Sequence, residues 1–125
     1  MGLTYDTGAL NAADRDDRLM WSLHRAAMGR GLPPTVPAGV LAEAWRGGPQ
    51  HRLSRLLKGC KVEEMDEIQA RQVGWLIARS GLNDIVDVAV VEGAIRRSDA
   101  VVTSDRSHIE QVADVVRTRM SIHDV

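Results

Sequence analysis

The stretch that decides the fold is Ala100-Val101-Val102-Thr103-Ser104-Asp105, in which four residues typical of a buried strand run directly into a polar turn and an acid. Leu3-Thr4-Tyr5-Asp6 has the same form, a short strand that ends in an acid. Helical patterns separate the two segments, and strands that alternate with helices are typical of parallel crossover units. The sequence therefore predicts an α/β fold with a mostly parallel central sheet of about four to five strands and helices on both faces.

The remaining elements follow from apolar periodicity and from the breaks between periodic segments. A helical stretch starts after Thr7-Gly8, and we expect helices over residues 14–31, 38–46, 50–58, 66–79, 84–97 and 107–113. Extended segments are expected at 33–37, where prolines limit pairing, at 61–65, and at 117–122 as an edge strand. In the helix capped by Asp66, we expect Ile68, Val73 and Leu76 to face inward.

Length and composition favour one domain over residues 1–125. The chain is 44% hydrophobic and 26% charged, which is ordinary for a globular protein. Its one cysteine, Cys60, cannot form an intramolecular disulfide, so we expect a reducing, cytoplasmic setting. We find no signal-peptide pattern and no apolar run near the roughly 20 residues that span a bilayer, so no membrane partner is expected.

Positive charge is concentrated in one segment, although the formal net charge is only −1. No acid occurs between Glu43 and Glu63, whereas this segment contains Arg46, Arg52, Arg55, Lys58 and Lys61. Two interpretations stay open. The cations can form the solvated face of an amphipathic helix, or they can attract phosphate beside an acidic site at Glu43.

Four acids lie in apolar surroundings: Asp6, Glu43, Asp87 and Asp105. Asp6 and Asp105 follow predicted strands, Glu43 lies in a short apolar helix, and Asp87 interrupts the most hydrophobic helix. An unpaired carboxylate in such a place is costly, so each needs a cation, a hydrogen-bond donor or a proton. Structural roles are open for each one: Asp6 and Asp105 could cap helices or turns, and Glu43 could pair with a cation on its helix.

The expected sheet brings these acids to a common edge. Ligands of parallel α/β sheets bind at the carboxyl ends of the strands, where Asp6 and Asp105 are predicted to lie. Clustered carboxylates repel one another unless a cation lies between them, and Mg²⁺ or Mn²⁺ prefers such oxygen ligands. Asp84 we assign first to the N-cap of the helix that contains Asp87. The four acids therefore predict a divalent-metal site.

Four segments together resemble the PIN-domain ribonucleases, and among these the VapC-type toxins of type II toxin–antitoxin systems. The resemblance covers essentially the whole chain in motif order and spacing. Its segments are Tyr5-Asp6-Thr7-Gly8-Ala9-Leu10, Val40-Leu41-Ala42-Glu43-Ala44-Trp45-Arg46-Gly47-Gly48, Asp84-Ile85-Val86-Asp87-Val88-Ala89 and Val101-Val102-Thr103-Ser104-Asp105. The resemblance implies that Asp6, Glu43, Asp87 and Asp105 hold the metal, with Thr7 and Ser104 as polar neighbours and Asp84 as an additional acid.

The same resemblance implies a function. The protein would be a Mg²⁺-dependent endoribonuclease (Mn²⁺ being possible), in which a metal-polarised water attacks the scissile phosphorus and leaves a 5′-phosphate and a 3′-hydroxyl. Arg46, Arg52, Arg55 and Lys58 would guide the RNA substrate. Family behaviour further implies a homodimer and a cognate antitoxin protein; Trp21 and Trp45 could serve that interface or the core.

Two positions depart from the family pattern. Val88 follows Asp87 where alanine is common, and His108 stands three residues after Asp105, where many members have another acid. A catalytically weak or inert PIN-like module that acts through antitoxin or RNA binding is therefore the main alternative. A metal-free ribonuclease is disfavoured because the four histidines are scattered, and a phospho-receiver domain because it needs adjacent acids after the first strand and a late lysine.

Overall fold

The computed structural model describes residues 1–125 as five strands and seven helices. In chain order these are β1 (Leu3–Tyr5), α1 (Thr7–Asp14), α2 (Arg18–Gly29), β2 (Thr35–Pro37), α3 (Ala38–Ala44), α4 (His51–Leu57), β3 (Lys61–Glu63), α5 (Glu67–Ser80), α6 (Ile85–Arg97), β4 (Ala100–Thr103), α7 (Arg106–Val115) and β5 (Ile122–Asp124). The sheet order is β3-β2-β1-β4-β5, and all four pairings are parallel. The predicted α/β class is confirmed. None of the helices has the length and apolar character that a membrane crossing requires.

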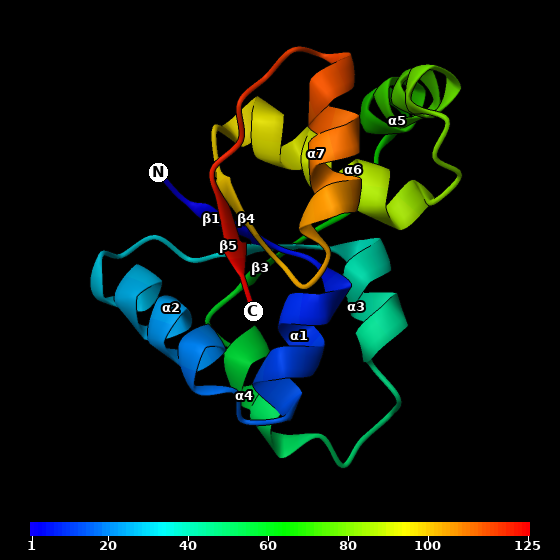
Figure 1. Cartoon of the computed structure of the whole chain (residues 1–125). Coiled ribbons are helices and arrows are strands. Elements are labelled where there is room, and N and C mark those ends of the chain that lie inside the picture. Colours follow the sequence, from blue (N-terminus) through cyan, green and yellow to red (C-terminus); the bar gives the residue numbers. More distant parts are fainter.

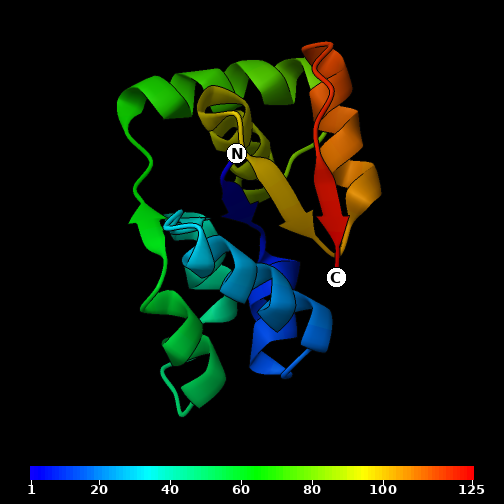
Figure 2. The ribbon, with the colours of Figure 1, turned by 90° about the vertical axis from the view of Figure 1, so that its left-hand side faces the viewer.

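Helices cover both faces of the sheet. Helix α1 contacts α2, α3 and α4, and this group lies on one side (Figure 1). Helix α6 contacts α5 and α7 on the other side, and α5 runs along the outside of that layer from the β3 side towards α7 (Figure 2). The two groups of helices leave the carboxyl edge of the strands between the start of α1 and the start of α7.

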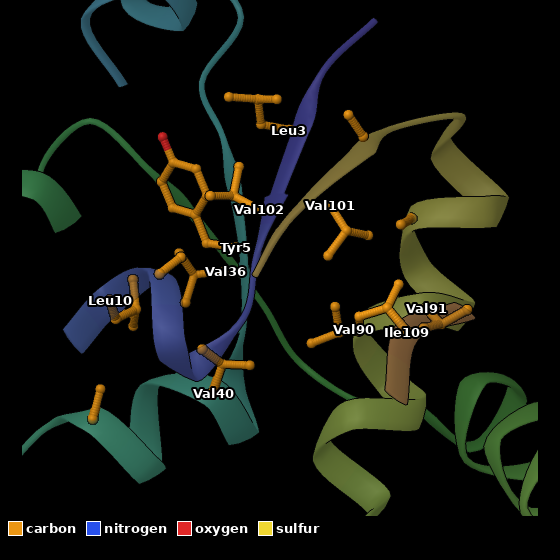
Figure 3. Packing of buried hydrophobic residues seen from close by; sticks show 14 of the residues in the cluster. Leu3, Tyr5, Leu10, Val36, Val40, Val90, Val91, Val101, Val102 and Ile109 are labelled. Carbon is orange, nitrogen blue, oxygen red and sulfur yellow. The ribbon is translucent and has the colours of Figure 1, made fainter. Parts of the chain in front are cut away.

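The alternation of side chains along the strands divides the core into two halves. On the side of α1, Tyr5 and Val102 pack with Leu10, Val36 and Val40, whereas Val101 faces Val90, Val91 and Ile109 of α6 and α7 (Figure 3). All of these side chains are fully buried or nearly so. Each buried valine or leucine stabilises the fold by roughly 1.5–3 kcal/mol, so the sheet is held firmly from both faces.

The N-terminal helical region differs from the prediction. The expected single helix over 14–31 is wrong at its start, because α1 ends at Asp14 and α2 begins at Arg18. Asp16 between them has a φ of 62°, and the Asp17 carboxylate caps α2 by accepting a hydrogen bond from the Met20 N–H at 2.9 Å. The aspartates thus separate two helices instead of extending one.

Smaller differences occur elsewhere. Ile68 was expected to face inward but is 76% exposed, and Gln69 is buried instead. The last strand is an edge strand as predicted, but it begins at Ile122, where the expected segment ended. The extended segment with the prolines is an internal strand, because β2 pairs with both β1 and β3.

An arginine anchors the C-terminal end of α6. The Arg97 guanidinium donates to the Thr4 hydroxyl at 2.9 Å, to Asp99 Oδ2 at 3.0 Å and to Glu63 Oε2 at 2.6 Å. Thr4 lies on β1 and Glu63 on β3, so one side chain connects the end of the helix to two strands. These half-buried, charge-assisted bonds fix the position of α6 against the sheet.

Candidate functional site

Two of the four acids lie at the carboxyl edge of adjacent strands. Asp6 directly follows β1, and Asp105 lies two residues beyond β4. The strands are paired in parallel with Tyr5 opposite Val102, and the Asp6 N–H donates to the Val102 carbonyl at 3.1 Å. The sheet therefore places Asp6 and Asp105 at the same edge, as ligand sites of parallel sheets require.

Asp6 is buried and has several donors. It caps α1 by accepting a hydrogen bond from the Ala9 N–H at 2.9 Å, and its second oxygen accepts one from the Thr103 hydroxyl. Burial raises the pKa of Asp6 and the charge of Asp87 adds to this, while the hydrogen bonds from Thr103 and Ala9 oppose the increase. Asp6 therefore caps α1, which is one of the structural roles considered from the sequence. Helix capping alone does not require that the carboxylate be buried.

Asp105 uses its carboxylate differently. It holds the N-cap position of α7 without a side-chain capping bond, and it accepts a hydrogen bond from the Ser107 hydroxyl at 2.9 Å. Its backbone N–H donates to the Thr103 hydroxyl at 2.8 Å. Since the same hydroxyl donates to Asp6, Thr103 connects the two acids, a role that the sequence analysis did not assign.

Asp87 and Glu43 reach this edge from helices. Asp87 lies in the first turn of α6, behind the predicted Asp84 N-cap, which accepts hydrogen bonds from the Val86 and Asp87 N–H groups at 2.9 and 3.1 Å. Burial raises the pKa of Asp87, and the charges of Asp84 and Glu43 raise it further. Glu43 on α3 is exposed and accepts a 2.6 Å hydrogen bond from the hydroxyl of Thr7. Thr7 directly follows Asp6 in the chain.

No arginine or lysine neutralises these acids. The ion pairs of the structure include no contact within 4 Å from either residue type to Asp6, Glu43, Asp87 or Asp105. The charge of Asp87 contributes to the raised pKa of Asp6, and the charges of Asp84 and Glu43 contribute to the raised pKa of Asp87. Acids that repel one another without a cationic partner are typical of cation sites.

His108 is the one basic side chain in contact with the group. Its Nδ1 lies 3.2 Å from Asp105 Oδ2 and 3.4 Å from Asp87 Oδ2. The sequence alone indicates a departure from the family pattern at His108 but not these contacts. The three-residue spacing from Asp105 in the first turn of α7 is the signal that places the two side chains on one helix face.

The donor chemistry of the site fits a hard divalent cation, since carboxylate oxygens are the ligands such ions prefer. The arrangement is nevertheless open: no three or more His, Cys, Asp or Glu side chains are grouped closely enough to hold a metal ion as they stand. Side-chain rotation would have to bring the oxygens together. Asp105 and Glu43 have the freedom for this, because the side chain of Asp105 is 51% exposed and Glu43 lies at the surface.

The polar neighbours expected from the resemblance also lie at this edge. Thr7 orients Glu43, and Asp84 caps the helix that presents Asp87. Ser104 is exposed beside Gly8, where an added Cβ would lie only 1.9 Å from the Ser104 Oγ. Glycine at position 8 therefore allows the β4–α7 loop to approach the start of α1.

Three of the four basic residues lie away from the acids. Arg52, Arg55 and Lys58 are exposed on and directly after α4, whereas Arg46 follows α3 and its Nη1 donates to the carbonyl of Ala42, the residue before Glu43, at 3.3 Å. The α3–α4 loop meets the far end of α1, where Gln50 Nε2 lies 3.4 Å from Asp14 Oδ2, whereas the acids surround the start of this helix. The eight residues of α1 span about 12 Å, and this length lies between the acids and the cations of α4.

Two of these cations have other contacts. Arg52 lies 3.9 Å from Asp16, and the Arg55 guanidinium stacks 4.6 Å from the ring centre of Trp21. Trp21 itself is buried and donates from Nε1 to the Ala13 carbonyl at 3.0 Å, whereas Trp45 is 41% exposed. Both interpretations of the basic segment therefore stay open.

Comparisons with known proteins agree with this architecture. No protein-family model matches the chain, and no curated protein sequence matches it. Among solved structures, a chain of VapBC2 from Rickettsia felis, crystallised bound to a DNA fragment from their promoter, is similar over 100% of this chain and 99% of that one, with a TM-score of 0.76 at 13% identity. PAE2754 from Pyrobaculum aerophilum is similar over 98% of this chain and 83% of that one, with a TM-score of 0.66 at 17% identity. At these identities the similarity establishes the fold, so the chain has the PIN-like α/β fold that the sequence resemblance implied.

Proposed function

We propose that the protein is a divalent-metal-dependent endoribonuclease that acts as the toxin of a toxin–antitoxin pair in the cytoplasm. The observation that carries the proposal is the convergence of Asp6, Asp87 and Asp105 at one edge of a parallel sheet, with Glu43 alongside and no arginine or lysine in contact. The similarity to a chain of VapBC2 supports it.

The four acids would hold Mg²⁺ or Mn²⁺. When bound, such an ion lowers the pKa of water and stabilises the charge that develops on a phosphodiester. The chain's own contribution is orientation: the Thr103 hydroxyl and the Ala9 N–H fix the Asp6 carboxylate, and the Thr7 hydroxyl fixes that of Glu43. Thr103 and Thr7 are thus positioning residues.

RNA binding would extend from this edge along α1 to α4. A single strand can bridge a separation of about 12 Å, so Arg52, Arg55 and Lys58 would hold phosphates upstream or downstream of the cleaved bond, with Arg46 closer to Glu43. Their role then is affinity and salt dependence, not chemistry. Single-stranded or looped RNA is the expected substrate because its backbone is accessible.

The expected protein partners are a second copy of the chain and an antitoxin. Met65, Ile68 and Ile85 are 41%, 76% and 56% exposed and line two adjoining hollows that share Glu63 and Gln69. Grouped exposed apolar side chains are typical of interaction surfaces. We assign this surface to the homodimer, which size-exclusion chromatography with light scattering would test on Ile68→Asp.

Cleavage of total RNA by the purified protein tests the enzymatic part of the proposal. We expect cleavage with Mg²⁺ or Mn²⁺, none with a chelator, and 5′-phosphate and 3′-hydroxyl ends. Asp6→Asn and Asp87→Asn should each reduce the rate by at least about a hundredfold, whereas Asp114→Asn, an exposed acid on α7, should be as active as the wild type. Cleavage that survives the chelator, or full activity of both site variants, would refute the assignment.

A binding module without catalysis is the second candidate. It is favoured by the absence of any grouped set of three metal-binding side chains. Calorimetric titration separates the two functions, because an inert module would bind antitoxin or RNA but neither Mg²⁺ nor Mn²⁺.

A further inference from the structure

The contacts of His108 bear on which metal the site takes, an inference that rests on the proposed function. His108 is the third residue of α7, and Asp105 holds the N-cap of the same helix. Residues three apart on a helix share a face, so the imidazole points where the Asp105 carboxylate points. The 3.2 Å between His108 Nδ1 and Asp105 Oδ2 shows that the two side chains meet.

The same ring nitrogen also meets an acid from a different helix. Asp87 Oδ2 of α6 lies 3.4 Å from His108 Nδ1, so one nitrogen lies between two carboxylates that come from separate parts of the chain. The side chain of His108 is 46% exposed and that of Asp87 22%. The imidazole therefore lies at the solvent-exposed side of the acidic edge and is not buried in the core.

The placement brings His108 Nδ1 within hydrogen-bonding distance of both carboxylates, so the imidazole and the two acids occupy one site. Asp105 makes no capping bond that would need the histidine, and its other partner is the neighbouring Ser107 hydroxyl. The remaining three histidines, His24, His51 and His123, are not in contact with any of the four acids. Among the basic side chains, His108 is alone in reaching two of the proposed ligands.

We propose that His108 is a nitrogen ligand that makes the site select a first-row transition metal, such as Mn²⁺, over Mg²⁺. Mg²⁺ takes oxygen ligands and keeps several waters, so an imidazole adds little to its affinity. Imidazole is a good ligand of the later divalent ions, whose affinity for mixed nitrogen and oxygen sites rises along the series from Mn²⁺. One nitrogen among carboxylates therefore separates the two classes of ion without any change in the acids.

Pulsed electron paramagnetic resonance of the Mn²⁺-loaded protein tests this directly. A nitrogen ligand gives echo modulation at nitrogen frequencies, and we expect this modulation in the wild type, its loss in His108→Gln, and its retention in His51→Gln. His51 is exposed at the start of α4 and is the matched control. Circular dichroism melting would verify that the variants are folded, and the wild-type spectrum is informative without any variant.

Calorimetric titration with Mn²⁺ and with Mg²⁺ measures the selectivity of the site between the two ions. The wild type should bind Mn²⁺ roughly tenfold or more tightly than Mg²⁺, and His108→Asp should reduce this ratio several-fold because it offers oxygen alone. Binding of Mn²⁺ to the wild type and its loss in Asp87→Asn would support the metal site itself. If nitrogen modulation is then absent, or the ratio of Mn²⁺ to Mg²⁺ affinity is unchanged in His108→Asp, only the role of His108 is overturned. If neither ion binds the wild type, the proposed function fails together with it.

Discussion

Thr103→Val should lower the free energy of unfolding at pH 7 by about 2–4 kcal/mol, although the side chains have nearly the same shape. The buried Thr103 hydroxyl donates to the Asp6 carboxylate and accepts from the Asp105 N–H at 2.8 Å. A hydrogen bond to a charged group contributes about 1.5–3 kcal/mol, and a neutral one about 0.5–1.5 kcal/mol. Valine removes both and leaves a carboxylate in an apolar site with the Ala9 N–H as its remaining close donor.

This loss should depend on pH in a defined direction. Burial raises the pKa of Asp6 above its unfolded value of 3.8, and the Thr103 hydrogen bond limits that rise. The folded state therefore holds the proton more tightly than the unfolded state, so Asp6 reduces stability as the pH rises through its folded pKa. Valine raises this pKa further. The loss caused by Thr103→Val should consequently be smaller near pH 4 than at pH 7.

Urea denaturation of the metal-free protein at both pH values measures the effect. Thr118→Val is the control, because the Thr118 hydroxyl makes one local 3.3 Å bond to the Val116 carbonyl. It should change the free energy of unfolding by no more than about 0.5 kcal/mol at either pH. A loss below about 0.5 kcal/mol for Thr103→Val, or an equal loss at the two pH values, would show that Thr103 does not hold the Asp6 carboxylate.

Three further predictions concern stability. Asp87→Asn should raise the Tm of the metal-free protein by roughly 2–5 °C, because burial and neighbouring acids disfavour the ionised carboxyl; an unchanged Tm would contradict this. Gly8→Ala should cost about 1–3 kcal/mol in urea denaturation because its Cβ would lie 1.9 Å from the Ser104 Oγ, whereas Gly74→Ala in α5, with open space around it, should stabilise by up to about 1 kcal/mol; equal effects would refute the close approach. Burial lowers the pKa of His24 below 6.5, so the unfolded chain takes up a proton first and wild-type stability falls as the pH drops below that value. The difference in unfolding free energy between pH 7 and pH 5.5 should be smaller in His24→Gln, and an identical difference would exclude His24 as its source.

The sheet and the order of its elements were predictable because the strands have recognisable local sequence patterns. Residues 100–102 are continuously apolar, and together with Thr103 they are buried, so a segment of this kind is compatible with few environments. The break between α1 and α2 was not predictable, because the acids of residues 14–17 suit a first helical turn as well as a turn between helices. Only the packing of α2 decides between the two. Ile68 was misplaced because the first turn of α5 buries the polar Gln69 and leaves its neighbour Ile68 on the exposed face, which a pattern of apolar residues does not predict.

The sequence was sufficient to predict that acids lie at the carboxyl edge of the sheet, but not the contacts between their side chains. Position after a parallel strand places Asp6 and Asp105, and this is a rule of topology. Contacts between side chains on different helices, such as His108 with Asp87, depend on how α6 and α7 pack and have no local signal. The distance of the α4 cations from Glu43 likewise follows from the path of the α3–α4 loop, although the two are close in sequence.

Helix α6 has Asp87 in its first turn and Arg97 in its last, about 15 Å apart along the axis. An α-helix is stiff over this length, so the bonds from Arg97 to Thr4 and Glu63 set the angle at which the whole rod meets the sheet. Loss of these bonds would tilt α6 and displace Asp87 at its other end, although no residue of the acidic edge is substituted. Substitutions near Arg97 are therefore expected to affect the position of the Asp87 carboxylate, although Arg97 does not contact Asp87.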